Sequence, residues 1–220
     1  MPISLRPSMR PSAELAVVPV DTESASSTAR LQRILTWVLI VGGGIGWISS
    51  FVLTVEKLRL AEDPEYVPSC SINPVLSCGS VMATPQAELF GFANSLLGVT
   101  GFAVVVTVGA ARLAGAVFQR WFWLALQLGT TAGAVLVHWL IVQSLYRIDA
   151  LCPYCMTVWA ATIVIFWYVT LACLNHLRGT RGTRISALLV ANHAVPLTIW
   201  VLAVLGLIAQ RFWNYWSTLV

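Results

Sequence analysis

The chain has 220 residues, of which 58% are hydrophobic and 10% are charged, and its mean hydropathy is +0.79. Soluble domains carry about 25% charged residues, so this composition excludes an ordinary soluble protein. The net charge of +4 does not indicate a nucleic-acid-binding protein, because membrane orientation explains the distribution of basic residues more simply.

The N-terminal segment is rich in Ser, Pro and Arg and lacks hydrophobic periodicity. Such composition is typical of a disordered tail. The apolar stretch after Arg33 is too long for the core of a signal peptide, and no small-x-small cleavage site follows it closely. We therefore predict a disordered cytoplasmic tail over residues 1–32, followed by a membrane helix.

Five segments of the chain contain no Asp, Glu, Lys or Arg. A helix needs roughly 20 apolar residues to cross the hydrocarbon core, and lipid offers no hydrogen-bond partners to any other backbone conformation. The sequence predicts an all-α membrane protein with five transmembrane helices. The segments lie between Arg33 and Glu56, Glu88 and Arg112, Arg120 and Arg147, Asp149 and Arg178, and Arg184 and Arg211, and hold 22, 23, 26, 28 and 26 residues.

Nine of the thirteen basic residues fall on one side of a five-span protein, in the N-terminal segment and in the second and fourth connections. The opposite side receives the other four, together with six of the nine acidic residues. By the positive-inside rule, the N-terminus is cytoplasmic and the C-terminus lies outside. The protein is expected in the cell inner (plasma) membrane as a multi-pass protein.

Four of the five cysteines lie on the outer side, where disulfides can persist. Cys70 and Cys78 lie in the long outer loop, and Cys152 and Cys155 form a CPYC motif just before the fourth span. Cys173, at the inner end of that span, is interpreted as a packing residue.

The CPYC motif is predicted to begin a membrane helix. Pro153 suits the first helical turn, which places Cys152 at or near the N-cap and Cys155 at about the third position. Helix N-termini stabilise thiolates, so the motif is interpreted as a redox pair with a thiolate favoured at Cys155. An inert disulfide is the alternative, but a bridge between positions i and i+3 closes almost no loop and stabilises little.

The loop pair, CSINPVLSC, lies in an irregular segment rich in Pro and Ser. Alone it could be a structural staple, but beside a second dithiol it can exchange electrons through mixed disulfides. No haem, flavin or iron–sulfur motif is present, so a lipid-soluble quinone is the simplest acceptor. A quinone needs an apolar pocket with a few polar donors, for which Asn94, Ser95 and Trp159 are candidates. His138, within the third span, is interpreted as either a packing residue or part of a proton relay.

The spaced loop pair, the following Thr84, the Phe90-Gly91 and Asn94-Ser95 dipeptides and the later CPYC helix resemble the vitamin K epoxide reductase family. The resemblance covers about residues 34–175. It implies a four-helix bundle around a quinone, over residues 33–175 with an outer loop over 56–90. Residues 176–220 would hold a peripheral fifth helix and a short outer tail, whose aromatic residues Phe212, Trp213, Tyr215 and Trp216 fit an interfacial belt.

The resemblance also implies residue roles. Cys155 would face the quinone, Cys152 would exchange with Cys78, and Cys70 would meet a partner protein. Asn94 would bond one quinone oxygen, Thr84 stands where the family commonly has Ser, and Trp159 stands where animal members have a quinone-bonding Tyr.

We therefore expect a disulfide-forming oxidoreductase that passes electrons from the loop pair to CPYC and then to menaquinone or ubiquinone. Its partner would be a separate periplasmic or extracellular thioredoxin-like dithiol oxidant, since no such domain follows the fifth span. Two alternatives remain: a quinone or quinone-epoxide reductase that uses the same residues, and a zinc-binding membrane module. The x7 and x2 spacings do not resemble usual zinc sites.

Overall fold

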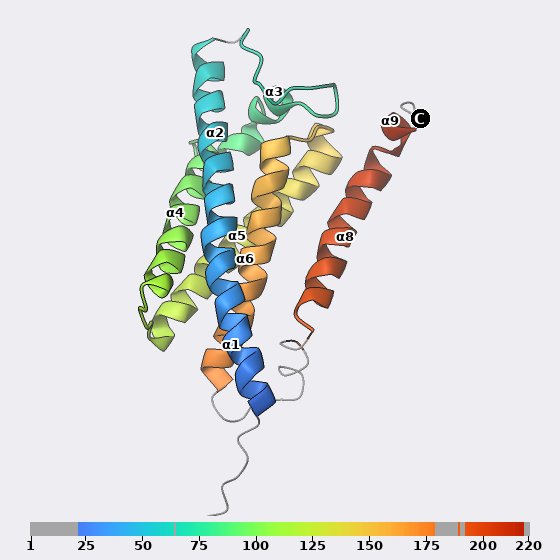
Figure 1. Cartoon of the computed structure of the whole chain (residues 1–220). Coiled ribbons are helices and arrows are strands. Elements are labelled where there is room, and N and C mark those ends of the chain that lie inside the picture. The colour runs from blue at the N-terminus through green and yellow to red at the C-terminus, as the bar shows by residue number, and fades with distance from the viewer. Residues whose placement is uncertain (1–21, 64, 179–188, 190–191, 218–220) are drawn as a thin grey trace, which may run out of the picture.

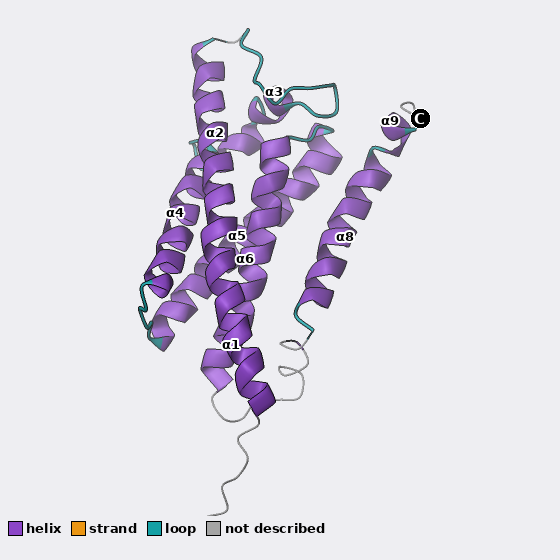
Figure 2. Cartoon of the chain, in the orientation of Figure 1, coloured by secondary structure: helices purple, strands orange, loops and turns teal. Residues whose placement is uncertain are grey.

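In the described part of the chain, five helices are long and apolar enough to cross a membrane, as the charge-free segments predict. The computed structural model describes residues 22–63, 65–178, 189 and 192–217. Over these residues the chain forms helices joined by loops, with no strand (Figures 1 and 2). The described elements are α1 (Thr22–Trp37), η1 (Val38–Gly42), α2 (Gly43–Glu62), α3 (Cys78–Met82), η2 (Pro85–Glu88), α4 (Asn94–Leu113), α5 (Arg120–Gln143), η3 (Ser144–Ile148), α6 (Pro153–Arg178), α8 (Ala194–Arg211) and α9 (Trp213–Trp216).

The first membrane helix begins earlier than the sequence predicts. Helix α1 begins at Thr22, so residues 22–32 are helical rather than disordered, while residues 1–21 lie outside the described part. Leu31 and Leu35, one helical turn apart, are buried in the main hydrophobic cluster with Leu171 of α6. Burial of this leucine face stabilises the helix beyond the membrane segment.

Helices α2, α4, α5 and α6 form the four-helix bundle, with α2 packed against α4 and α6, and α5 against α6. Close approach of α2 and α4 depends on a glycine. A Cβ atom at Gly46 would lie 2.5 Å from the ring of Phe102, so any larger side chain there requires the ring to move. Gly42 and Gly46 form a GxxxG spacing, which is therefore a helix-packing feature, as it is in other membrane helices.

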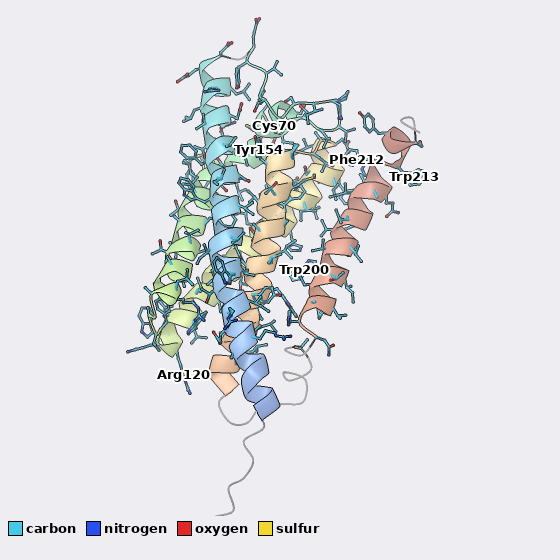
Figure 3. All side chains as sticks on the ribbon, viewed as in Figure 1. Cys70, Arg120, Tyr154, Trp200, Phe212 and Trp213 are labelled. Carbon is cyan, nitrogen blue, oxygen red and sulfur yellow. A yellow bond between two sulfur atoms is a disulfide. The ribbon has the colours of Figure 1, made fainter. Side chains whose placement is uncertain are left out.

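Helix α8 is peripheral, and polar contacts attach it to the bundle (Figure 1). Midway along it, the indole N–H of Trp200 donates to Nε2 of His138 on α5 at 3.0 Å, and Nδ1 of His138 lies 2.7 Å from the Ala134 carbonyl oxygen (Figure 3). This pairing requires the proton on Nδ1, which makes His138 a contact between helices. At the end of α8, Phe212 is buried against Trp159 and Leu151, so it does not belong to an exposed aromatic belt.

The long loop lies at the opposite end of the bundle from the start of α1 and at the same end as α9 (Figure 1); we call this end the loop end. Helix α2 continues to Glu62, so the irregular segment begins at Asp63 rather than at residue 56. The short helices α3 and η2 follow it and return the chain to α4.

Candidate redox site and apolar cavity

Three cysteine sulfurs meet at the loop end. Cys70 and Cys78 form a disulfide, and the Sγ atom of Cys78 lies 2.9 Å from that of Cys152. The three Sγ atoms all lie within 4.8 Å of one another, and all three side chains are buried. Cys155 is outside this group and only partly buried. Sulfurs this close can exchange disulfide bonds with little movement of the backbone.

A short backbone pairing sets the distance between Cys78 and Cys152. Leu76 and Leu151 form a parallel β-bridge, in which the Ser77 N–H donates to the Leu151 carbonyl at 2.9 Å and the Leu151 N–H donates to the Val75 carbonyl at 2.7 Å. Ser77 and Leu151 directly precede the two cysteines. The bridge therefore fixes the register of the loop cysteine against the CPYC motif. Sequence patterns could not predict it, since each partner is a single residue in an irregular segment.

Cys152 caps helix α6, as the motif predicts. Pro153 is the first residue of the helix, the carbonyl of Cys152 accepts the Met156 N–H at 3.0 Å, and its Sγ accepts the Cys155 N–H at 3.5 Å. The S–H group of Cys155, which donates to Cys152, lowers the pKa of the Cys152 thiol; burial opposes this shift, and backbone N–H groups of Cys155 and Tyr154 add to it. The thiolate is thus favoured at Cys152 rather than at Cys155, because the S–H group of Cys155 and then the helix N–H groups donate to the capping sulfur.

An apolar cavity of about 580 Å³ lies inside the bundle, and Cys155 is part of its wall. Lining residues on α4 and α5 include Val104 and Trp121, whose side chains are 53% and 66% exposed, so the cavity reaches the surface of the bundle between these helices. The lining residues used in the arguments below are Lys57, Met82, Asn94, Ser95, Cys155 and Trp159. Its size and largely apolar wall fit a small hydrophobic ligand ring.

The predicted quinone-contacting residues do not all line this cavity. Asn94, Ser95 and Trp159 do, whereas Thr84 is not among the described lining residues. The Thr84 hydroxyl donates to the Val81 carbonyl at 2.7 Å. The Asn94 side chain joins α4 to the short helix η2 and the residue after it. Its amide donates to the Gln86 carbonyl at 2.7 Å, and its oxygen accepts the Leu89 N–H at 3.1 Å. One amide hydrogen of Asn94 is left for a ligand.

The loop end of the cavity is covered by two short helices. Val81 and Met82 of α3 and Ala87 of η2 line it. Lys57 of α2 fastens this cover: its ammonium group donates to the Met82 carbonyl at 2.6 Å and pairs with Glu88 at 2.9 Å. The sequence showed Lys57 only as a charge beyond the first span, so its place in the cavity wall was missed.

The fold and the cysteine arrangement define a helical membrane protein with a dithiol–disulfide exchange site beside an apolar cavity. The chain belongs to the vitamin K epoxide reductase family, whose family model matches residues 37–170, more than half of the chain. Proteins of this family are oxidoreductases that are associated with quinones and generally work with thioredoxin-like partners. No curated protein gives a significant match to the chain.

Proposed function

We propose that this protein forms disulfides in a separate thioredoxin-like protein outside the cytoplasm and transfers the electrons to a membrane quinone. The observation that carries the proposal is the position of the CPYC pair: Cys152 lies 2.9 Å from Cys78, whereas Cys155 lines the apolar cavity. The pair thus connects a protein disulfide on one side with a lipid-soluble molecule on the other.

The first exchange takes place at the loop pair. A thiolate of the partner attacks the Cys70 sulfur, and Cys78 leaves as a thiolate. The second thiol of the partner then breaks the mixed disulfide, which releases the oxidised partner and leaves Cys70 and Cys78 reduced. Two electrons and two protons have moved from the partner to the loop pair.

The second exchange returns the loop pair to its oxidised state. The Cys78 thiolate attacks Cys152 of a Cys152–Cys155 disulfide and Cys155 leaves, after which Cys70 attacks Cys78 and Cys152 leaves. The lowered pKa of Cys152 makes it a good leaving group in this last step. The product has a Cys70–Cys78 disulfide with Cys152 and Cys155 as free thiols, the same bonding state described above.

The cavity residues fit a quinone ring. A bound quinone would supply an acceptor for the two electrons and two protons of Cys152 and Cys155. Asn94 and Trp159 would offer N–H groups to its oxygens, and the α3–η2 cover, fastened by Lys57 and Asn94, would exclude water. The family association with quinones and the largely apolar wall support this assignment.

The test uses purified protein in lipid nanodiscs, a reduced thioredoxin-like protein and a short-chain quinone. Cys155→Ala is expected to lower the rate of quinone-dependent partner oxidation at least about a hundredfold, because it removes the thiol next to the acceptor. Cys173→Ala is the matched control, since Cys173 lies in the same helix but is not a cavity-lining residue, and it should retain the wild-type rate. If the Cys155→Ala protein oxidises the partner at the wild-type rate, the proposal is contradicted.

A further inference from the structure

The outer segment that carries Cys70 is attached to α2 by a buried carboxylate. Glu56 is only 5% exposed, and both of its oxygens accept hydrogen bonds from this segment: Oε2 from the Tyr66 hydroxyl at 2.9 Å and Oε1 from the Ser69 hydroxyl at 2.8 Å. Ser69 directly precedes Cys70. We call these three residues the Glu56 network.

A carboxylate is buried only at a high cost in free energy unless it is hydrogen-bonded. The hydroxyl groups of Tyr66 and Ser69 are the described donors to Glu56, and both come from the loop. On the exposed side, Arg59 donates to the Tyr66 hydroxyl at 3.4 Å and lies 6.0 Å from the centre of its ring. The loop and the carboxylate therefore stabilise each other, and the whole segment of residues 66–70 is held against α2. We call this arrangement the closed position.

Cys70 cannot meet a partner in this closed position. Its side chain is 6% exposed and belongs to a buried cluster with Cys78, Cys152, Met82 and Leu53. Attack on a disulfide requires the incoming thiolate to reach the sulfur, which a buried sulfur does not allow. The segment around Cys70 must therefore lift before the loop disulfide can react with a protein outside.

We infer that Glu56 is a positioning residue whose network keeps Cys70 buried, and that release of this network presents Cys70 to the thioredoxin-like partner. The role of the partner rests on the proposed function, whereas the control of access to Cys70 does not. The attachment of Cys78 is independent of the network, because the backbone bridge between Leu76 and Leu151 holds it. The loop can thus open at Cys70 while Cys78 stays beside Cys152.

The test measures access to the loop disulfide with reduced glutathione as the probe, so it requires neither quinone nor partner. Cys152 and Cys155 are both replaced by alanine in the full-length protein. A glutathione thiolate attacks Cys70, Cys78 leaves as a thiolate, and a second glutathione releases glutathione disulfide and the Cys70 thiol. The rate of this reduction is followed by the mass shift of an alkylating label on the freed cysteines.

Glu56→Ala is expected to increase the rate of reduction about tenfold or more, since opening no longer breaks hydrogen bonds to a charged group. Glu56→Gln should give a smaller increase, because an amide can accept from one hydroxyl and donate to the other. Glu62→Ala is the matched control: it removes an exposed acidic residue from the same end of α2 and should leave the rate unchanged. Equal rates for Glu56→Ala and Glu62→Ala would overturn the inference.

A second measurement separates positioning from general loss of structure. With Cys70 and Cys155 replaced by alanine, Cys78 and Cys152 should oxidise to a disulfide, as their separation of 2.9 Å allows. Adding Glu56→Ala should leave the extent of this cross-link unchanged, since the backbone bridge is intact. A parallel loss of the cross-link would also overturn the inference, because Glu56 would then support the whole loop. Neither result depends on whether a quinone is the acceptor.

Discussion

The two sulfurs of the CPYC motif lie in different environments although only two residues separate their cysteines. Cys152 is fully buried among the loop cysteines and accepts the helix N–H groups, whereas Cys155 belongs to the wall of the apolar cavity. Under the proposed function, this division gives the exchange with the loop cysteines to Cys152 and the reaction with the electron acceptor to Cys155. It also gives the two thiols different acidities, because the S–H group of Cys155 and backbone N–H groups stabilise only the Cys152 thiolate.

The acidity of Cys152 is testable in a variant with Cys70, Cys78 and Cys173 replaced by alanine. Thiolate absorbance against pH should show one thiol with a pKa below the ordinary value of about 8.5. Replacing Cys155 by alanine as well should raise the pKa of Cys152, because the main donor to its sulfur is removed. The Cys152 thiolate forms as pH rises through this pKa. The reactivity of the Cys152 thiol as a nucleophile should therefore decrease as pH falls below it. An unchanged pKa without Cys155 would contradict this assignment.

Sequence reasoning identified the residues whose chemistry is local. The four cysteines and the N-cap position of Cys152 follow from motif and proline spacing, and three of the four predicted quinone contacts line the cavity. Glu56 and Lys57 were seen only as charges that end a span. Their partners are separated from them by between 10 and 31 residues, and such contacts arise only after the loop folds back onto α2.

At the scale of elements, the fifth helix does more than cross the membrane. At the end of α8, the Arg211 guanidinium donates to the Leu145 carbonyl at 2.8 Å and pairs with Asp149. Asp149 has a left-handed backbone conformation, with φ of 55°, in the turn that leads from η3 to Cys152. Helix α8 thus supports the turn that presents the CPYC motif, a contact that charge-free segments could not predict.

Removal of this support should lower stability. Arg211→Ala is expected to lower the free energy of unfolding by roughly 1–3 kcal/mol, because a charge-assisted hydrogen bond and a half-exposed ion pair are lost. Arg211→Lys should give an intermediate result, since a single ammonium group lacks the fork that reaches both acceptors. Thermal unfolding in detergent measures the effect, with the neighbouring exposed Gln210→Ala as the control. If the Arg211→Ala protein unfolds at the same temperature as the Gln210→Ala control, Arg211 does not stabilise this turn.

The five spans were predictable because lipid imposes a simple rule on composition, and TM segments follow the charge-free windows. The ends of the helices were less predictable. The first membrane helix, which runs from α1 through α2, extends past Arg33 and Glu56, the charged residues that bound its predicted segment. Leu31 is buried at one end of it and Glu56 at the other. Burial at a helix end depends on neighbouring elements and not on local charge.

At the scale of the whole molecule, the cysteine site and the start of α1 lie at opposite ends of the bundle (Figure 1). Among the described residues, the end away from the cysteines carries five basic residues: Arg30, Arg33, Arg112, Arg120 and Arg178. The positive-inside rule therefore predicts that the loop end faces away from the cytoplasm, where a disulfide can persist.

Reporter fusions test this orientation. A reporter enzyme that is active only outside the cytoplasm should be active when inserted after Asp63, in the loop, and inactive when inserted after Gly115, between α4 and α5. A second reporter that is active only in the cytoplasm should give the opposite pattern. The reverse result for both reporters would place the cysteine site in a reducing compartment and would contradict the predicted orientation.

The position of Cys152 also has a consequence for selectivity. Cys152 is fully buried between the loop disulfide and helix α6, while the cavity that Cys155 lines reaches the surface of the bundle between α4 and α5. Under the proposed function, a lipid-soluble molecule would reach Cys155 through this cavity, whereas a water-soluble thiol would first exchange at Cys70. Under the proposed function, the bundle would separate the soluble thiols, which are the reductant, from the membrane quinone, which is the oxidant. The proposed function then predicts that the quinone oxidises only those thiols that first react with Cys70.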